Sequence, residues 1–315
     1  MEPRFPRFAV TVLEETLHDR RLAGAPISWG VCEVPGWGRQ LEPRRVFAEM
    51  ASLGLHATEL GPVGWVPLDA SQIRATLEPF DLQLVAAFVP LVLHEPGAAP
   101  AREQAKAMAE LLAAAGAEIF VAAIVADEQW SPPPPSLADD QWDHLTAHLA
   151  EIDDLVTGLG LRLAVHPHVG TLVERDDAVQ RLLAASDAGW CLDTGHLLIG
   201  GTDPLDFVRR HGSRIVHVHL KDVDAEIAAR LRAGELSLVE ATQRGLFRPL
   251  GQGDARIEEV LRALDDAGYE RWLVLEQDTA ITGQEPPAGG GPVLDVATSI
   301  EYLTTRAPER EVAQR

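Results

Sequence analysis

Four short runs in the second half of the chain each join an apolar stem to a polar tip of metal-ligand residue types. They cover residues 163–168, 190–196, 215–222 and 272–278. A polar tip at the end of one apolar strand is common. The same arrangement on four successive strands predicts a single site, because the carboxyl ends of neighbouring parallel strands meet at one face.

The tips supply imidazole and carboxylate groups in a set that suits a divalent metal ion. The preferred ligands, one from each run, are His166, Asp193, His219 and Glu276. Such ligands suit Mn²⁺, Co²⁺, Fe²⁺ or Zn²⁺ better than Mg²⁺ or Ca²⁺, and we expect Mn²⁺ or Co²⁺. Taken singly, each residue has a plainer explanation, as a core His, a turn-forming Asp, or a solvated or helix-capping Glu.

Composition narrows the class of partner. The chain has 315 residues and a formal net charge of −21, from 27 basic and 48 acidic side chains. Such a field repels phosphate backbones and anionic lipid, so neither a nucleic acid nor a membrane is expected as a partner. Cys32 and Cys191 lie in or beside apolar runs. We therefore expect both to be buried, reduced thiols.

Apolar, strand-like runs alternate with amphipathic helical patterns along the chain. Strands are expected at residues 25–30, 56–61, 83–90, 118–124, 162–168, 190–196, 215–222 and 272–278. Helices are expected at residues 43–53, 101–115, 141–159, 176–185, 204–211, 255–267 and 293–305. This alternation favours a single (β/α)8 TIM barrel of the α/β class. A doubly wound sheet would need a Gly-rich fingerprint that residues 36–38 do not complete.

The barrel is expected to span residues 25–305, between an N-terminal extension (1–24) and a tail (306–315). The N-terminus lacks the apolar segment of a signal peptide, and no run is long enough to span a membrane, so a cytoplasmic location is expected. Residues 224–245 are expected to form a helical insertion on the active-site face. The proline-rich residues 131–136 form either a lid edge or a plain surface loop.

Several motifs carry a family resemblance. They are Asp-Thr-Gly-His at residues 193–196, His-Leu-Lys-Asp at 219–222, Gly-Gln-Gly at 251–253 and the late Glu276. In this order they resemble the xylose-isomerase-like TIM barrel superfamily of sugar isomerases, epimerases, dehydratases and endonucleases. The resemblance covers about residues 25–305.

Within that superfamily, the chain looks like the myo-inosose-2 dehydratase branch. The runs that carry this closer resemblance are residues 166–174, 191–196 and 276–278, with 25–30 and 58–62. The resemblance implies a hydro-lyase of inositol catabolism, within carbohydrate metabolism. It would remove water from 2-keto-myo-inositol (inosose), or a close keto-polyol, through a metal-stabilised enolate. The product would be a trihydroxycyclohexane dione.

One residue separates the two main functions that the superfamily offers. Sugar epimerases and isomerases of this kind usually carry a Glu where the fifth strand here ends in His166. Two carboxylates then pass a proton between carbons of the substrate. An imidazole at this position disfavours such a shuttle and favours a dehydratase. A sugar (ketose) isomerase or epimerase stays the alternative.

The resemblance to a dehydratase implies roles for further side chains. His168 or Glu276 would take the α-proton, and His196 would hold or protonate a substrate hydroxyl. Lys221 would neutralise the developing oxyanion. Asp222 would either join the site or only pair with Lys221.

Three residues from earlier strands are expected to contact the polyol. Glu59 and Trp29 would line the pocket, although Trp29 is equally compatible with core packing. His94 lies either at the pocket mouth or in a surface loop.

Two further classes of protein were weighed. An apurinic endonuclease would need additional metal ligands and a basic groove, which the charge of −21 disfavours. A non-catalytic sugar-sensing barrel would not need all four ligands. The expected partner is therefore a small polyol or keto-polyol, with a homo-oligomer possible.

Overall fold

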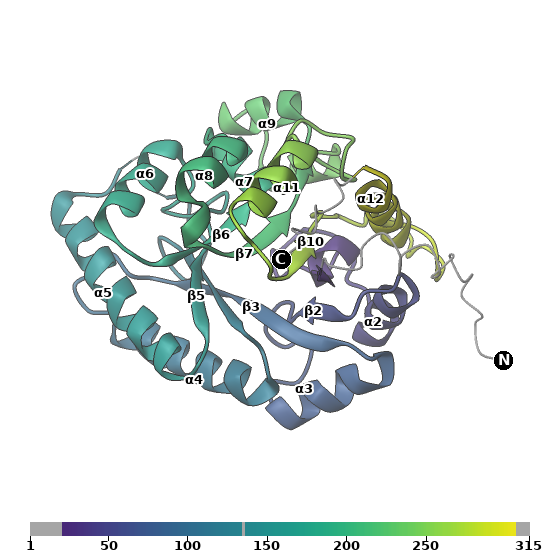
Figure 1. Ribbon diagram of the computed structural model, residues 1–315, viewed down its shortest axis with the longest axis horizontal. Coiled ribbons are helices and arrows are strands. Elements are labelled where there is room, and N and C mark those ends of the chain that lie inside the picture. Colours follow the sequence, from purple (N-terminus) through teal and green to yellow (C-terminus); the bar gives the residue numbers. More distant parts are fainter. Residues whose placement is uncertain (1–20, 134–135, 307–315) are drawn as a thin grey trace, which may run out of the picture.

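The computed structural model describes residues 21–133 and 136–306, and its centre is a closed barrel of parallel strands (Figure 1). Around the barrel the strands follow the order β1-β10-β7-β6-β5-β4-β3-β2. Their bounds are β1 Leu22–Gly24, β2 Ala57–Glu59, β3 Gln83–Leu91, β4 Ile119–Ile124, β5 Arg162–Val165, β6 Gly189–Asp193, β7 Ile215–Leu220 and β10 Leu273–Leu275. The predicted TIM barrel is confirmed.

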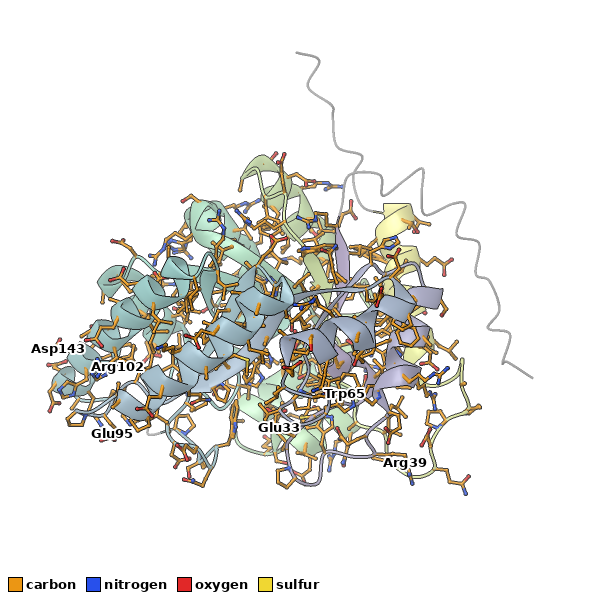
Figure 2. All side chains as sticks on the ribbon, turned by 90° about the horizontal axis from the view of Figure 1, so that it is seen from below. Glu33, Arg39, Trp65, Glu95, Arg102 and Asp143 are labelled. Atoms are coloured by element: carbon orange, nitrogen blue, oxygen red, sulfur yellow. The ribbon has the colours of Figure 1, made fainter. Side chains whose placement is uncertain are left out.

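Helices surround the barrel and bury their apolar stripes against it (Figure 1). They are α2 Pro43–Ser52, α3 Ala70–Leu77, α4 Ala99–Ala115, α5 Asp139–Gly158, α6 Asp176–Ala185, α7 Thr194–Gly200, α8 Pro204–His211, α11 Ile257–Asp266 and α12 Pro292–Arg306. In α11, for example, Ile257, Val260, Leu261 and Leu264 recur at helical spacing and are buried. Charged residues cover the outside. Arg102 of α4, labelled in Figure 2, pairs with Glu151 of α5 at 2.6 Å.

The predicted insertion after the seventh strand is present. It contains α9 (Ala225–Arg232) and α10 (Leu238–Gln243), between the short antiparallel strands β8 (Asp222–Val223) and β9 (Phe247–Arg248). A separate apolar cluster, which includes Val223, Leu246 and Phe247, packs this insertion against α7. The insertion therefore has its own small core beside the barrel end at which β6 and β7 finish.

The first strand was predicted in the wrong place. Residues 25–30 were expected to form it, but Pro26–Trp29 form a short 3-10 helix and β1 precedes them. Pro26 has no N–H to donate to a strand ladder, so pairing with β10 ends at Ala25, whose N–H donates to Leu275. The barrel thus begins at Leu22, inside the predicted extension.

Two other elements differ from the prediction. The strand expected at residues 190–196 ends at Asp193, and α7 begins at the next residue. Helix α3 was not predicted.

Residues 1–20, 134–135 and 307–315 lie outside the described chain, so most of the predicted extension, part of the proline-rich loop and the tail are not tested. Among the described helices, none combines the length and apolarity that crossing a membrane requires.

Asp222 organises the loop that follows the insertion. Its carboxylate accepts hydrogen bonds from the backbone N–H groups of Gly251 (2.8 Å), Gly253 (3.0 Å) and Ala255 (2.9 Å). A Cβ at Gly253 would lie only 2.5 Å from Asp222 Oδ1, which explains the glycine. The alternative that Asp222 pairs with Lys221 is wrong, because this carboxylate is occupied by the loop backbone.

We predict that Asp222→Asn lowers the free energy of unfolding by about 2–4 kcal/mol. An amide oxygen cannot replace a buried carboxylate that accepts several N–H donors, and unsatisfied buried donors are costly. Urea unfolding followed by circular dichroism would measure the change. Asp266→Asn, at an exposed carboxylate, is the control and should change stability little. An equal effect of both substitutions would contradict the prediction.

Candidate metal and active site

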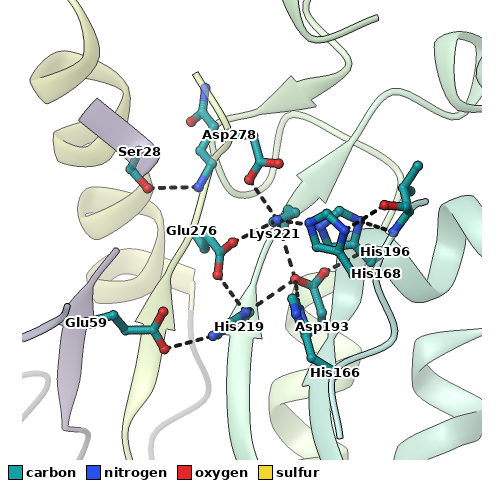
Figure 3. Close-up of polar contacts among 12 residues, drawn as sticks. Ser28, Glu59, His166, His168, Asp193, His196, His219, Lys221, Glu276 and Asp278 are labelled. Carbon is teal, nitrogen blue, oxygen red and sulfur yellow. Dashed lines mark hydrogen bonds and ion pairs between the residues drawn. The ribbon is translucent and has the colours of Figure 1, made fainter. Parts of the chain in front are cut away.

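The four predicted ligands converge inside the carboxyl end of the barrel (Figure 3). His166 Nε2 lies 3.2 Å from Asp193 Oδ2, and His219 Nδ1 lies 3.5 Å from the same oxygen. His219 Nδ1 also lies 2.6 Å from Glu276 Oε2. All four side chains are buried.

The barrel order explains this convergence. Strands β5, β6, β7 and β10 are neighbours, so their four tips stand side by side. Asp193 pairs directly with His219 in the strand register, and β10 pairs with β7 on the other side. Residues two apart on a strand point to the same face. His217 and Cys191 therefore lie one layer deeper than His219 and Asp193.

The protonation states suit a divalent cation. Burial lowers the pKa of His166, which keeps its imidazole neutral. Burial alone would raise the pKa of Glu276, but His219 and Lys221 outweigh it and hold that pKa at about 2. Burial raises the pKa of Cys191 to about 11, so its sulfur stays a thiol and a poor ligand. Both cysteines are free and buried, as predicted.

Buried polar atoms without hydrogen-bond partners lie in the same cluster. Within the described chain, His219 Nδ1 and Glu276 Oε2 have no hydrogen-bond partner of acceptable geometry although both are buried. Buried polar atoms are rarely left in this state unless a ligand or ion completes them. Ligand atoms of Asp193, His219 and Glu276, and likewise those of His166, Asp193 and His196, lie within 4.8 Å of one another. The residues present therefore fit a divalent metal ion.

Lys221 supplies the positive charge of the site. Its side chain is fully buried, and Nζ lies 2.7 Å from Asp278 Oδ1, 3.0 Å from Glu276 Oε1 and 3.5 Å from Asp193 Oδ2. Burial alone would lower the pKa of this ammonium group, but the three carboxylates outweigh burial and raise it well above its ordinary value. Lys221 thus stays charged.

The Asp-Thr-Gly-His motif assembles around Lys221. Asp193 caps α7 by accepting the N–H of His196 at 2.7 Å. Thr194 Oγ1 donates to the carbonyl of Lys221 at 2.7 Å and accepts its N–H at 2.9 Å. A Cβ at Gly195 would lie 2.6 Å from Lys221 Cγ, so only glycine leaves room for the lysine stem. His196 Nε2 lies 2.9 Å from Lys221 Nζ.

His168 faces the accessible side of the site. Among the histidines at the barrel end it is half-buried, whereas His166, His196 and His219 are buried. Its Nδ1–H donates to the carbonyl of Val169 at 2.7 Å, which leaves the lone pair on Nε2. Burial lowers the pKa of His168 to about 3, so the ring is neutral.

Two aromatic rings stand beside His168. Phe88 and Trp130 stack with centroids 5.9 Å apart, and they lie 5.5 Å and 5.9 Å from the His168 ring. Both are half-buried, and Trp130 adopts a left-handed φ of 56° that is unusual for a non-glycine residue. This pair forms an apolar wall at the accessible edge of the site.

The three residues from earlier strands that were expected to contact substrate are all buried. Trp29 is fully buried in the core between barrel and helices, and its Nε1–H donates to Glu49 of α2 at 2.9 Å. Of the two roles that the sequence left open for Trp29, the structure shows core packing. His94 is buried and pairs with Glu95 at 3.2 Å. Glu59 contacts His219 from the side opposite the other ligands, at Nε2.

His196 and Glu276, which were expected to act on the substrate, both contact other side chains of the site. His196 Nε2 accepts a hydrogen bond from the Lys221 ammonium group at 2.9 Å, and the backbone nitrogen of Val169 lies 3.4 Å from its Nδ1. Glu276 directs one oxygen to Lys221 and the other to His219. Both groups thus have polar partners within the protein, and their catalytic roles stay predictions.

Sequence reasoning missed four residues of the site. They are Phe88, Trp130, His217 and Asp278. Asp278 ends the same polar tip as Glu276, and His217 shares a strand face with His219, so both carried a local signal. Phe88 and Trp130 had none, because Phe88 belongs to an apolar strand run and Trp130 to a loop, and an aromatic residue in either place usually packs in the core or on the surface.

The fold and the site define a family. The chain belongs to the xylose isomerase-like TIM barrel family, whose model matches residues 47–304. An inosose dehydratase from Geobacillus thermodenitrificans (strain NG80-2) is 31% identical over 273 residues, which cover 83% of this chain and 91% of that protein. These findings confirm the predicted family and the predicted class of enzyme, a hydro-lyase.

Solved structures agree on the fold alone. The probable 3-DHS dehydratase AsbF, involved in petrobactin synthesis in Bacillus anthracis, superposes with a TM-score of 0.65 at 14% identity. That match covers 91% of this chain and 99% of AsbF. An L-ribulose 3-epimerase superposes with a TM-score of 0.66 at 16% identity, over 90% of this chain and 93% of the epimerase.

We predict that Lys221→Met lowers the free energy of unfolding of the metal-free protein by about 3–5 kcal/mol. Removing one partner of a buried ion pair leaves uncompensated buried charge, here on Asp278 and Glu276. Chemical denaturation in the presence of a chelator would measure it. Lys106→Met is the matched control, since Lys106 is exposed and lies 3.8 Å from Glu110. A loss below about 1 kcal/mol would contradict the importance of this charge.

Proposed function

We propose that the protein is a metal-dependent dehydratase that removes water from inosose or a close keto-polyol. The observation that carries the proposal is the buried convergence of His166, Asp193, His219 and Glu276 beside the Lys221 ammonium. The relative named inosose dehydratase, matched over most of both chains, supports the choice of substrate. Mn²⁺ is the proposed ion, with Co²⁺ next.

The four ligands would hold the metal ion, two through imidazole and two through carboxylate. When bound there, a divalent ion acts as a Lewis acid toward the ketone oxygen and the neighbouring hydroxyl. Lys221 stands beside Glu276 and Asp193, where its fixed positive charge stabilises negative charge that develops on the substrate.

His168 is the proposed proton carrier. Its Nε2 lone pair accepts the proton from the carbon next to the ketone, which leaves an enolate. The C–O bond at the following carbon then breaks. His168 returns its proton to the departing hydroxyl, so water is released and an enol remains, which becomes the dione by tautomerisation. Phe88 and Trp130, beside His168, offer an apolar wall to the C–H face of the polyol ring.

The same geometry disfavours the epimerase alternative. A two-carboxylate shuttle needs a second carboxylate opposite Glu276, but the residue that follows β5 is His166, whose imidazole is neutral. His168 lies on the same side as His166, with ring centroids 5.3 Å apart. The site therefore offers one half-buried base, His168, and not a matched pair of acids.

We expect purified protein to contain a stoichiometric divalent metal and to convert 2-keto-myo-inositol to a dione. Ultraviolet absorbance of the product would follow the reaction. Chelation should abolish turnover, and added Mn²⁺ should restore it. Inversion of a ketose carbon without loss of water from inosose would overturn the proposal in favour of an epimerase.

We predict that His168→Asn lowers kcat roughly 100- to 10,000-fold, the range for loss of a general acid–base group, with little change in KM. Steady-state kinetics with inosose would test this at matched metal content. His56→Asn, at an exposed histidine, is the control and should leave both constants unchanged. Full activity of His168→Asn would show that another residue carries the proton.

A cytoplasmic location and a homo-oligomeric state stay predictions.

A further inference from the structure

A second polar layer lies directly behind His219. Glu59 Oε1 accepts the Nε2–H of His217 at 2.7 Å and the Nε2–H of His219 at 3.0 Å. All three side chains are buried. Glu59 comes from β2, which is separated from β7 by β1 and β10, so the contact crosses the barrel interior. Figure 3 shows Glu59 and Asp193 on opposite sides of the His219 ring.

The two ring nitrogens of His219 therefore have different partners. Nε2 faces Glu59, whereas Nδ1 faces Glu276 at 2.6 Å and Asp193 at 3.5 Å. A metal ion binds only a neutral imidazole, which has one N–H and one lone pair. Because the carboxylate of Glu59 accepts the proton on Nε2, the nitrogen that would lose its proton to bind a metal ion is Nδ1, which faces the other ligands.

We propose that Glu59 is a positioning residue for the metal, acting through His219, and not the substrate contact that its sequence position indicated. It selects the tautomer of His219 and fixes the ring plane, and His217 holds the Glu59 carboxylate in place. Carboxylates that orient a ligating histidine in this way raise its basicity and strengthen metal binding. The inference rests on the proposed metal-dependent function.

A second metal site at Glu59, His217 and His219 is the competing explanation, since their ligand atoms lie within 4.8 Å of one another. His219 belongs to both groups, and its single lone pair can serve only one ion. The group around Asp193 and Glu276 has two carboxylates, whereas the deeper group has only Glu59. The greater negative charge favours the ion at the outer group.

The test is a titration of metal-free protein with Mn²⁺, in which electron paramagnetic resonance reports the free ion. Wild-type protein should bind one Mn²⁺ per chain. Glu59→Gln should still bind one Mn²⁺, but 10- to 100-fold more weakly, as is typical when a carboxylate behind a ligating histidine is lost. This readout does not depend on catalysis.

Glu49→Gln is the matched control. Glu49 is also a buried carboxylate that accepts N–H donors, from Trp29, Arg45 and Gly289, but it lies outside the metal cluster. It should lower stability without weakening Mn²⁺ binding. If Glu59→Gln does not fold, Glu59→Asp carries the test, and its affinity should fall below that of the control.

Each contrary result has a distinct meaning. Equal Mn²⁺ affinity in Glu59→Gln and wild type would overturn the positioning role. A fall from two ions per chain to one would show that Glu59 is itself a ligand, which also overturns it. No Mn²⁺ binding by wild-type protein would refute the metal-dependent function, and the inference with it.

Discussion

The candidate site depends on one buried charge, the ammonium group of Lys221. Asp193, Glu276 and Asp278 all come within 3.5 Å of it, and none of these carboxylates could stay ionised in the barrel interior without compensation. The surrounding residues serve this lysine in turn. Gly195 leaves space for its stem and Thr194 holds its backbone. By keeping Asp193 and Glu276 ionised, the lysine also maintains the negative charge that a divalent ion would need.

The barrel architecture makes this concentration of charge possible. The tips of β5, β6, β7 and β10 stand next to one another, and each adds a polar group to one shared interior. Below them, Glu59, His217 and Cys191 form a deeper layer, and apolar residues such as Val121 and Val274 fill the remainder. The polar end is thus supported by a rigid apolar floor, which holds the imidazole rings in fixed orientations.

Much of the fold could be predicted from the sequence, because a buried parallel strand and an amphipathic helix each leave a local pattern. Predicted helices at residues 176–185 and 204–211 match α6 and α8. The first strand was misplaced because Ala25-Pro26-Ile27 looks extended, yet a proline without an N–H cannot continue the ladder. Helix α3 was missed because its apolar face is short, with only Ile73 and Leu77 buried.

The sequence by itself determined which residue types end four adjacent strands, and so predicted His166, Asp193, His219 and Glu276 as one group. Strand-end position is a local property, and the barrel brings such ends together. Only the tertiary structure decided which atom faces which. Glu59 accepts a hydrogen bond from His219 Nε2 across the barrel, and Trp29 donates one to Glu49 in the core. Such pairings join residues far apart in the chain, and their direction follows from packing that no local pattern records.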